Sequence, residues 1–276
     1  MPIQTLNHYQ LYYSLSGSPQ NPPLLLLHGF MGSGEDFSEV LESLSRKFYC
    51  ITLDLPGHGQ TQVLGGNQFH KMPEVSQGIV ELLKELQTAP CFLLGYSMGG
   101  RLALYLALEF PQYFPKVILE SGSPGLATEI EREERRQKDE LLAKQLETND
   151  LQLFVQGWYH QPLFHSLKKH HKFNHVLQSR LQNNPLELAK SLRYMGPGVQ
   201  PSLWEKLPEN QVDLLLLAGQ SDGKFIKIHQ EMCQIAPRTQ WQIIPHSGHN
   251  IHLENVPAWL TAIQEFLSSE STVNLS

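Results

Sequence analysis

Three short apolar runs leave this chain few possible folds. They occur in PPLLLLHG, CFLLG and VDLLLLAGQSD, and each ends at a glycine or a polar loop. Unbroken runs of this length are typical of strands that are covered on both faces. Helical periodicity separates them, for example over Met98–Glu109. Strands that alternate with helices predict an α/β fold with a mostly parallel, doubly wound sheet.

The alternation stops between residues 124 and 207. This part holds the charged stretch ATEIEREERRQKDELLAKQL, then two or three further helical segments and no convincing strand. We therefore expect a core formed by residues 1–123 and 208–276, with residues 124–207 as a helical cap. Ser33 and Asp36 predict a capping box that opens a helix running to about Leu44. The polar end SSESTVNLS is expected to fray.

The composition argues against several classes of partner. The chain has 276 residues, 41% of them hydrophobic, and a formal net charge of −6, which disfavours nucleic acid and anionic membranes. No apolar run is long enough to cross a bilayer, and MPIQTLNHYQ does not resemble a signal peptide. Three distant cysteines suggest reduced, structural thiols. We expect a cytoplasmic monomer or weak homo-oligomer.

A nucleophile motif stands between a predicted strand and a predicted helix. GYSMG at residues 95–99 has the spacing G-x-S-x-G, in which the glycines permit a tight turn that raises the Ser97 hydroxyl above the sheet. Asp222 and His249 each follow a later strand. This chain order resembles that of α/β-hydrolases, in which the histidine takes the serine proton and the aspartate holds the imidazole. Singly, these residues also fit a helix cap, a turn and a surface loop; together they predict a catalytic triad.

Two backbone N–H groups are expected to complete this site. A developing oxyanion requires converging donors. Met98, directly after the serine, is expected to supply one, and Phe30 in the HGF turn the other. His246 is the alternative base, but the GH pair inside the loop favours His249. We interpret His58 in DLPGHGQT as structural.

An arginine near the serine narrows the choice of substrate. Arg101 lies one helical turn after Ser97, so both side chains are expected on one face of the helix. A buried guanidinium is unfavourable unless it is paired. Its partner is expected to be a protein carboxylate, for example Glu120, or an anionic substrate. Arginine pairs with a carboxylate through two hydrogen bonds, so Arg101 favours a carboxylated substrate over a neutral ester.

Several longer motifs together resemble one family. They are GYSMGGR, ESGSPGL, the arginine-rich EREERR, GWYHQPLF, GQSDGKF and GHNIHLEN. They resemble those of 2-succinyl-6-hydroxy-2,4-cyclohexadiene-1-carboxylate synthase, an α/β-hydrolase-fold enzyme of menaquinone or phylloquinone biosynthesis, over nearly the whole chain. The resemblance implies a lyase that uses no cofactor and no metal and acts on a small-molecule tricarboxylate.

The implied reaction is an elimination. A proton leaves the ring carbon next to the succinyl ketone of 2-succinyl-5-enolpyruvyl-6-hydroxy-3-cyclohexene-1-carboxylate, and pyruvate departs. Ser97, made basic by His249, would abstract that proton. The resemblance also implies a set of substrate-binding residues, namely Tyr96, Arg101, Arg135, Trp158, Arg180 and Lys224. Arg132 and Arg136 compete with Arg135 because all three belong to one charged helix.

Three other functions remain open at this point. A carbon–carbon bond hydrolase shares the triad and a carboxylated substrate, a general carboxylesterase has less need of Arg101, and a receptor can keep this fold without catalysis. The four histidines of HSLKKHHKFNH invite a metal interpretation. Because no carboxylate pattern accompanies them, a solvated helix face is favoured.

Overall fold

A single mixed sheet forms the centre of the molecule. The computed structural model describes residues 2–269, and within them nine strands pair in the order β1-β2-β4-β3-β6-β7-β8-β9, with β5 also paired to β2. The expected fraying of the C-terminal end falls largely on residues that lie outside this description. The strands are β1 Ile3–Leu6, β2 Tyr9–Ser16, β3 Pro23–Leu27, β4 Tyr49–Leu53, β5 Gln62–Val63, β6 Phe92–Tyr96, β7 Lys116–Glu120, β8 Asp213–Gly219 and β9 Thr239–Ile244.

The predicted parallel sheet is confirmed for the strands that carry the long apolar runs. From β4 across β3, β6, β7 and β8 to β9, every neighbouring pair is parallel. The structure adds an antiparallel margin that the sequence did not reveal, in which β1 and β5 pair with β2 and β2 pairs with β4. β1 escaped notice because IQTL alternates between exposed and half-buried residues and carries no apolar run.

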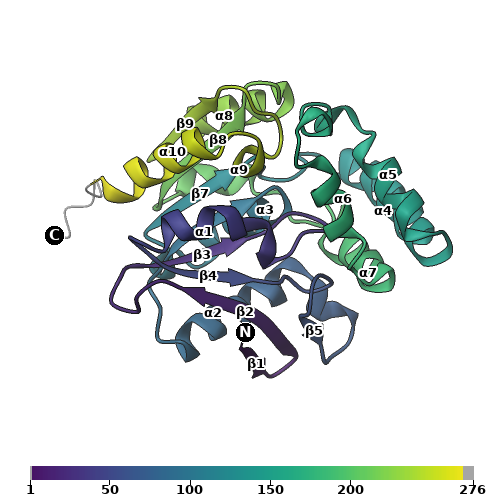
Figure 1. Cartoon of the computed structure of the whole chain (residues 1–276), viewed down its shortest axis with the longest axis horizontal. Coiled ribbons are helices and arrows are strands. Elements are labelled where there is room, and N and C mark those ends of the chain that lie inside the picture. The colour runs from purple at the N-terminus through teal and green to yellow at the C-terminus, as the bar shows by residue number, and fades with distance from the viewer. Residues whose placement is uncertain (1, 270–276) are drawn as a thin grey trace.

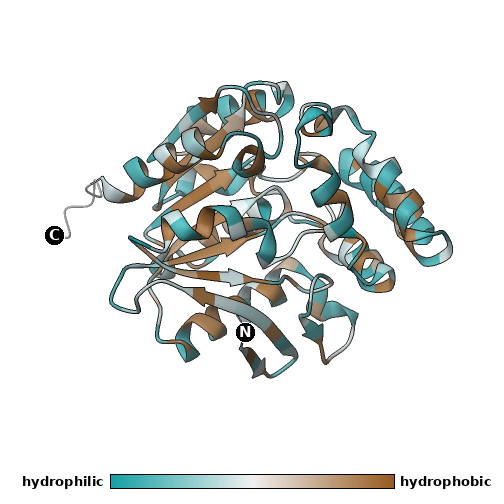
Figure 2. Cartoon of the chain, viewed as in Figure 1, coloured by the Kyte–Doolittle hydropathy of each residue, from teal (hydrophilic) through white to brown (hydrophobic). Residues whose placement is uncertain are grey.

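Helices cover both faces of the sheet, as the doubly wound fold requires (Figure 1). One face is covered by α1 and α10, whose apolar side chains pack around the fully buried Trp259. The opposite face is covered by α2, α3 and α8. Figure 2 shows the strands between these two layers as largely hydrophobic. The helices are α1 Ser38–Leu44, α2 Met72–Glu85, α3 Met98–Glu109, α8 Gly223–Ile235, α9 Ile251–Glu254 and α10 Val256–Ser268.

Between β7 and β8 the chain leaves the sheet and forms a helical insertion. Its helices are α4 Glu129–Thr148, α5 Leu151–Tyr159, α6 Phe173–Arg180 and α7 Pro185–Met195. They gather at one end of the molecule in Figure 1 and enclose a small apolar core of their own, which includes Phe154, Tyr159 and Leu188. The charged segment predicted as a helix is α4, which begins with a capping box between Thr128 and Glu131.

The two ends of this insertion are tied together. The Leu203 N–H donates to the Pro124 carbonyl oxygen at 2.8 Å, and the Trp204 indole N–H donates to the Gly125 carbonyl oxygen at 3.1 Å. The insertion therefore leaves and rejoins the core at neighbouring points, beside the end of β7.

Asp36 does not form the predicted capping box, and that expectation was wrong. Ser33 caps a 3₁₀ helix, Gly34–Phe37, by accepting from the Glu35 N–H, and α1 begins only afterwards. The Asp36 carboxylate instead pairs with Arg180. Five further 3₁₀ helices complete the described elements: Asn67–His70, Pro111–Tyr113, Pro162–Phe164, Leu167–Lys169 and Trp204–Glu209.

The three cysteines are free thiols, as the sequence predicts: Cys50 and Cys91 are buried and Cys233 is half-buried. Burial raises the pKa of the Cys50 thiol to about 12, which makes it unreactive. None of the helices in residues 2–269 is long and apolar enough to span a membrane.

Candidate active site

Ser97 lies at a strained turn between β6 and α3. Its backbone has φ 51° and ψ −104°, a conformation that residues other than glycine rarely adopt. The turn brings the start of α3 close to the end of β3, because a Cβ on Gly99 would lie 2.2 Å from the Leu27 carbonyl oxygen. The last glycine of the motif is therefore required by this contact, and the turn leaves the Ser97 side chain partly exposed at the strand end.

The three predicted triad residues meet at the carboxyl ends of the parallel strands. The His249 Nε2 atom lies 3.0 Å from the Ser97 Oγ atom, and His249 Nδ1 lies 2.8 Å from Asp222 Oδ2. Asp222 also caps α8 by accepting from the Phe225 N–H. The aspartate thus satisfies a helix terminus and holds the imidazole at once. This geometry allows His249 to take a proton from Ser97 while its other nitrogen donates to Asp222.

His246, the alternative catalytic base, lies at the protein surface, and within the described part of the chain it forms no hydrogen bond with Ser97 or Asp222. His246 is exposed, has φ 54°, and its backbone N–H donates to the Gln220 side chain. His249, in contrast, is 2% exposed and lies between aromatic rings, with the Phe225 centroid at 4.9 Å and the Phe164 centroid at 5.8 Å.

The sequence offered Glu120 only as a possible partner of Arg101 and did not reveal that this buried carboxylate fixes the histidine loop. Glu120, at the end of β7, accepts from the Ile251 N–H at 2.7 Å, the His252 ring at 2.9 Å and the Trp259 indole at 2.8 Å. The next residue, Ser121, donates to the His249 carbonyl oxygen at 3.0 Å. The sequence did carry one indication of this buried carboxylate: the apolar strand KVILE ends in an acidic residue. Our suggestion that Glu120 pairs with Arg101 was wrong, because its oxygens are already occupied here.

The two residues expected to carry the oxyanion donors border the same cavity as the serine. Phe30 and Met98 both line the cavity in front of Ser97. Met98 is the first residue of α3, where N–H groups have no partner within the helix. The turns that carry the two residues are joined by the Gly99 N–H, which donates to the His28 carbonyl oxygen at 3.1 Å. The arrangement fits a pair of donors for a developing oxyanion.

His58 lies behind this turn. Its ring is buried and lies 5.1 Å from the His28 ring and 5.5 Å from the Phe30 ring, between centroids. Burial holds the pKa of His58 well below its ordinary value, so the ring stays neutral. This placement agrees with a packing role.

Ten of the eleven site residues predicted from the sequence line one cavity of about 230 Å³. Asp222 is the exception, since it lies behind His249. Tyr96 forms part of the wall, with its ring centroid 5.5 Å from that of His249, and burial raises the pKa of its hydroxyl. Trp158 from α5 faces the core across the cavity, where its ring lies 4.9 Å from the Phe30 ring. The core and the insertion therefore both contribute to one site.

Three cationic side chains enter the cavity from different elements. Arg101 comes from α3, Arg135 from α4 and Lys224 from the first turn of α8. Burial, followed by repulsion from Arg135, lowers the pKa of Arg101 to about 10. The same two causes lower the pKa of Lys224, whose side chain remains partly exposed. One of the three is paired: Arg135 Nε donates to Asp139 Oδ1 at 2.7 Å. The group is suited to an anionic ligand.

Arg180 also lines the cavity, but its charge is already paired. Its guanidinium donates to both Asp36 oxygens, at 2.6 and 2.9 Å, and to the Tyr159 hydroxyl at 3.1 Å. Burial alone would raise the pKa of Asp36, but Arg180 outweighs it and the pKa is lowered. The GWYHQPLF motif thus contributes Tyr159 as well as Trp158. No feature of the sequence pointed to Asp36 as the partner.

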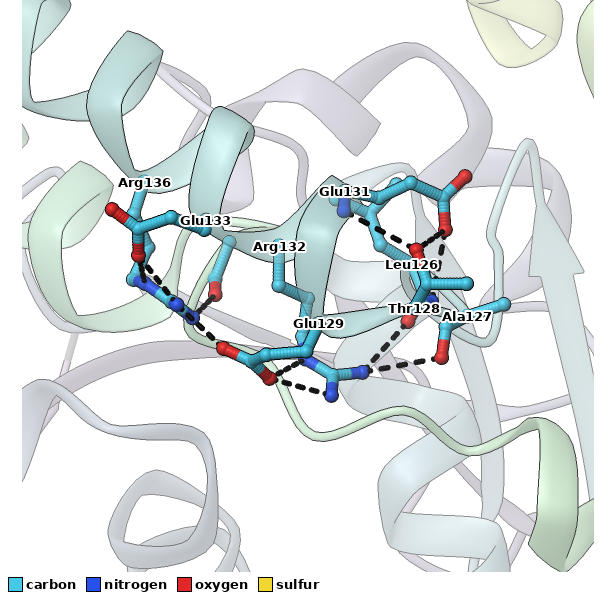
Figure 3. Close-up of polar contacts among 9 residues, drawn as sticks. Leu126, Ala127, Thr128, Glu129, Glu131, Arg132, Glu133 and Arg136 are labelled. Atoms are coloured by element: carbon cyan, nitrogen blue, oxygen red, sulfur yellow. Dashed lines mark hydrogen bonds and ion pairs between the residues drawn. The ribbon is translucent and has the colours of Figure 1, made fainter.

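The structure separates Arg135 from its two competitors on α4. Figure 3 shows Arg132 and Arg136 turned toward glutamates of the same helix. Arg132 donates to Glu129, and Arg136 pairs with Glu129 and Glu133. Neither arginine lines the cavity.

The histidine-rich segment does not form the expected helix face. It spans a 3₁₀ turn, Leu167–Lys169, and the start of α6 at Phe173. Within residues 2–269, no three side chains among His, Cys, Asp and Glu are grouped to hold a metal ion.

Comparison with known proteins gives a consistent result. Residues 22–256 match the α/β-hydrolase fold family model. A Bacillus subtilis protein named putative 2-succinyl-6-hydroxy-2,4-cyclohexadiene-1-carboxylate synthase is 36% identical, over 92% of this chain and 93% of its own length. The Arabidopsis thaliana Protein PHYLLO, chloroplastic, is 29% identical over 96% of this chain. The match covers only 16% of the length of that protein.

A solved structure extends the similarity to three dimensions. The structure of MenH from S. aureus superposes with a TM-score of 0.87 at 34% identity, and the match covers 95% of this chain and 98% of that one.

Proposed function

The chain belongs to the 2-succinyl-6-hydroxy-2,4-cyclohexadiene-1-carboxylate synthase family of α/β-hydrolase-fold enzymes, and from this premise we propose how its site performs the reaction. The enzyme is a lyase that forms this cyclohexadiene by eliminating pyruvate from 2-succinyl-5-enolpyruvyl-6-hydroxy-3-cyclohexene-1-carboxylate. The reaction belongs to menaquinone or phylloquinone biosynthesis.

One observation carries the proposal. A hydroxyl paired with a histidine opens into a cavity that also holds Arg101, Arg135 and Lys224. A hydrolase for neutral esters has no need of three cations beside its nucleophile, since burying them is unfavourable. A substrate with three carboxylates offsets this cost, because each carboxylate can pair with a cation inside a site of low dielectric.

The first step is a proton transfer. Ser97 removes the proton from the ring carbon next to the succinyl ketone, and its own proton passes to His249. Asp222 stabilises the imidazolium that results. The electron pair left on carbon moves to the ketone oxygen, where the Phe30 and Met98 N–H groups receive the negative charge.

The second step expels the leaving group. As the ketone re-forms, the ring double bond shifts and the bond from ring carbon to enolpyruvyl oxygen breaks. The enolate of pyruvate leaves with that electron pair and takes up the proton that His249 received from Ser97. No acyl-enzyme forms, so no water has to attack at Ser97. Arg101, Arg135, Arg180 and Lys224 are proposed to hold the carboxylates, and Tyr96 and Trp158 to form the wall.

The domain organisation and location extend this proposal. Residues 124–207 are proposed to act as a cap over the core formed by residues 1–123 and 208–276. The cavity supports this assignment, because Trp158 and Arg135 face it from the insertion and Ser97 from the core. We also propose that the protein acts in the cytoplasm, as a monomer or weak homo-oligomer.

The reaction is tested by measuring released pyruvate with lactate dehydrogenase. Wild-type protein is expected to release pyruvate from the enolpyruvyl substrate. The Ser97→Ala variant is expected to lose about 10²–10⁴-fold in kcat, which is the range for a positioned acid–base group. Ser38→Ala, at an exposed position on α1, is the matched control. Rapid cleavage of p-nitrophenyl esters without pyruvate release would instead identify an esterase.

A further inference from the structure

A buried glutamine holds the arginine next to the nucleophile. Gln200 follows α7, is 1% exposed, and donates its backbone N–H to the Gly196 carbonyl oxygen at 3.1 Å. Its side-chain oxygen accepts from the Arg101 Nη1 atom at 2.6 Å. The same nitrogen donates to the Met195 carbonyl oxygen at 3.1 Å. Both groups that hold this guanidinium are therefore neutral.

Neutral oxygen atoms are not the strongest hydrogen-bond acceptors for a buried guanidinium. A carboxylate would be the stronger partner, since ionised acceptors form shorter and stronger hydrogen bonds with arginine. Asp139, the carboxylate that attracts Arg101 through space, instead forms its ion pair with Arg135 at 2.7 Å. Arg101 is thus fixed by hydrogen bonds to neutral groups, and no carboxylate within residues 2–269 forms an ion pair with it directly.

The neighbourhood confines the glutamine amide. Gly125 has φ 89°, and a Cβ at this position would lie 3.0 Å from the Gln200 Nε2 atom, so the backbone approaches the amide closely. Nε2 is buried and has no hydrogen-bond partner among residues 2–269. A buried donor without a partner is unfavourable for folding. The site therefore tolerates an unsatisfied N–H in order to place the amide oxygen against Arg101.

We propose that Gln200 is a positioning residue that aims Arg101 into the cavity while leaving its positive charge for a carboxylate of the ligand. The inference rests on the proposed function only in that the ligand is an anion. It explains why an amide occupies a position where a carboxylate would bind the guanidinium more tightly. A glutamate there would neutralise Arg101 and repel the incoming carboxylate.

Binding of a stable dicarboxylate separates this inference from the lyase reaction. The probe is 2-succinylbenzoate, which carries a ring carboxylate and a succinyl arm and has no leaving group; its dissociation constant is measured by calorimetry. Gln200→Glu is expected to weaken binding at least about tenfold, as a close charge pair does when it is disrupted. Gln242→Glu, an exposed position on β9, adds the same charge outside the cavity and is expected to bind within about twofold of wild type.

A neutral replacement tests the positioning role independently. Gln200→Met keeps the side-chain length but removes the acceptor, so the charge of Arg101 stays available while its position loosens. Binding of 2-succinylbenzoate is expected to stay within about threefold of wild type, whereas kcat for pyruvate release falls about tenfold or more. Thermal unfolding checks that each variant folds.

The outcomes decide the inference in each case. Binding by Gln200→Glu as tight as wild type, or loss of binding by Gln200→Met equal to that in the glutamate variant, would overturn it. If Gln200→Glu does not fold, the methionine variant alone decides: an unchanged kcat, or binding weakened by about tenfold or more, would then overturn the inference. If wild-type protein binds the probe with the expected order of variants but releases no pyruvate, the proposed reaction fails while the role of Gln200 stands.

Discussion

Ser97 and Arg101 have separate proposed roles: Ser97 transfers a proton, and Arg101 supplies a positive charge that binds a carboxylate. Their separation by four residues on α3 places both in the same cavity, and the strained backbone at Ser97 fixes where that helix begins. Strain of this kind persists only where the surroundings impose it. Here the imposing contact is the approach of Gly99 to the end of β3.

Removing the arginine tests its share of the binding energy. Arg101→Ala is expected to lower kcat/KM for the enolpyruvyl substrate by about 2–5 kcal/mol of transition-state stabilisation, because one carboxylate loses its charge-assisted partner. Steady-state kinetics with the pyruvate assay measure this change. Arg132→Ala is the control and should change kcat/KM little, because Arg132 pairs with Glu129 and does not line the cavity. An unchanged value in Arg101→Ala would mean that the arginine serves only the fold.

Individual residue roles were predictable where a motif fixes the backbone, and less so where the partner is distant in sequence. The G-x-S-x-G turn and the strand-end positions of Asp222 and His249 follow from local pattern. The partners of Arg101 and Arg180 do not, because Gln200 and Asp36 lie 99 and 144 positions away from them. Only the folded chain brings those pairs together.

Among the secondary-structure elements, the contact between the first 3₁₀ helix and α6 joins the core to the insertion. It consists of the Asp36–Arg180 pair, in which both side chains are buried. The sequence predicted helical structure in both segments but neither the separate 3₁₀ helix nor its contact with α6. Local patterns indicate that a segment is helical, whereas the way two elements pack depends on the whole chain.

Breaking this ion pair should be costly. Asp36→Asn is expected to lower the free energy of unfolding by about 3–5 kcal/mol, because the buried Arg180 charge loses its counter-ion. The double variant Asp36→Asn with Arg180→Met should recover most of that loss, since no buried charge then remains unpaired. Urea denaturation measures both.

An ion pair at the protein surface serves as the control for the buried Asp36–Arg180 pair. Glu42 and Arg46 are joined at 2.8 Å on the surface, and Glu42→Gln should cost less than about 1 kcal/mol. A loss in Asp36→Asn no larger than this would contradict the assigned role of the pair. Because the pKa of Asp36 is lowered, its stabilising contribution should persist at neutral pH and disappear only as the pH falls through that lowered value.

At the scale of the whole molecule, the positive charge in the cavity is opposite in sign to the net charge of the chain. The chain carries a formal net charge of −6, yet its cavity gathers Arg101, Arg135 and Lys224. Composition predicts the net charge of the whole chain but could not reveal a local positive site. That site required the insertion to place Arg135 opposite the cations of the core.

The lowered pKa values predict how activity depends on pH. The cationic forms bind the substrate, and its carboxylates stay ionised at high pH. Since the pKa of Arg101 is lowered to about 10 and that of Lys224 is lowered as well, kcat/KM should fall as the pH rises toward and through 10. Pyruvate release between pH 7 and 10.5 measures the profile, and circular dichroism confirms that the fold persists.

A lysine substitution sharpens this test. Lysine has a lower ordinary pKa than arginine, so Arg101→Lys should move the alkaline decline to lower pH. A profile that stays flat to pH 10.5 in both proteins would show that neither cation is needed in its charged form.

The hydrogen bond between Leu203 and Pro124 has an evolutionary consequence. The helical insertion leaves and rejoins the core at neighbouring points. Its exchange by recombination would therefore leave Ser97, Asp222 and His249 in the core unchanged. Half of the proposed ligand-binding residues, namely Arg135, Trp158 and Arg180, would by contrast be replaced in a single genetic event. Such an architecture allows new substrates to be acquired by swapping one module rather than by rebuilding a catalyst.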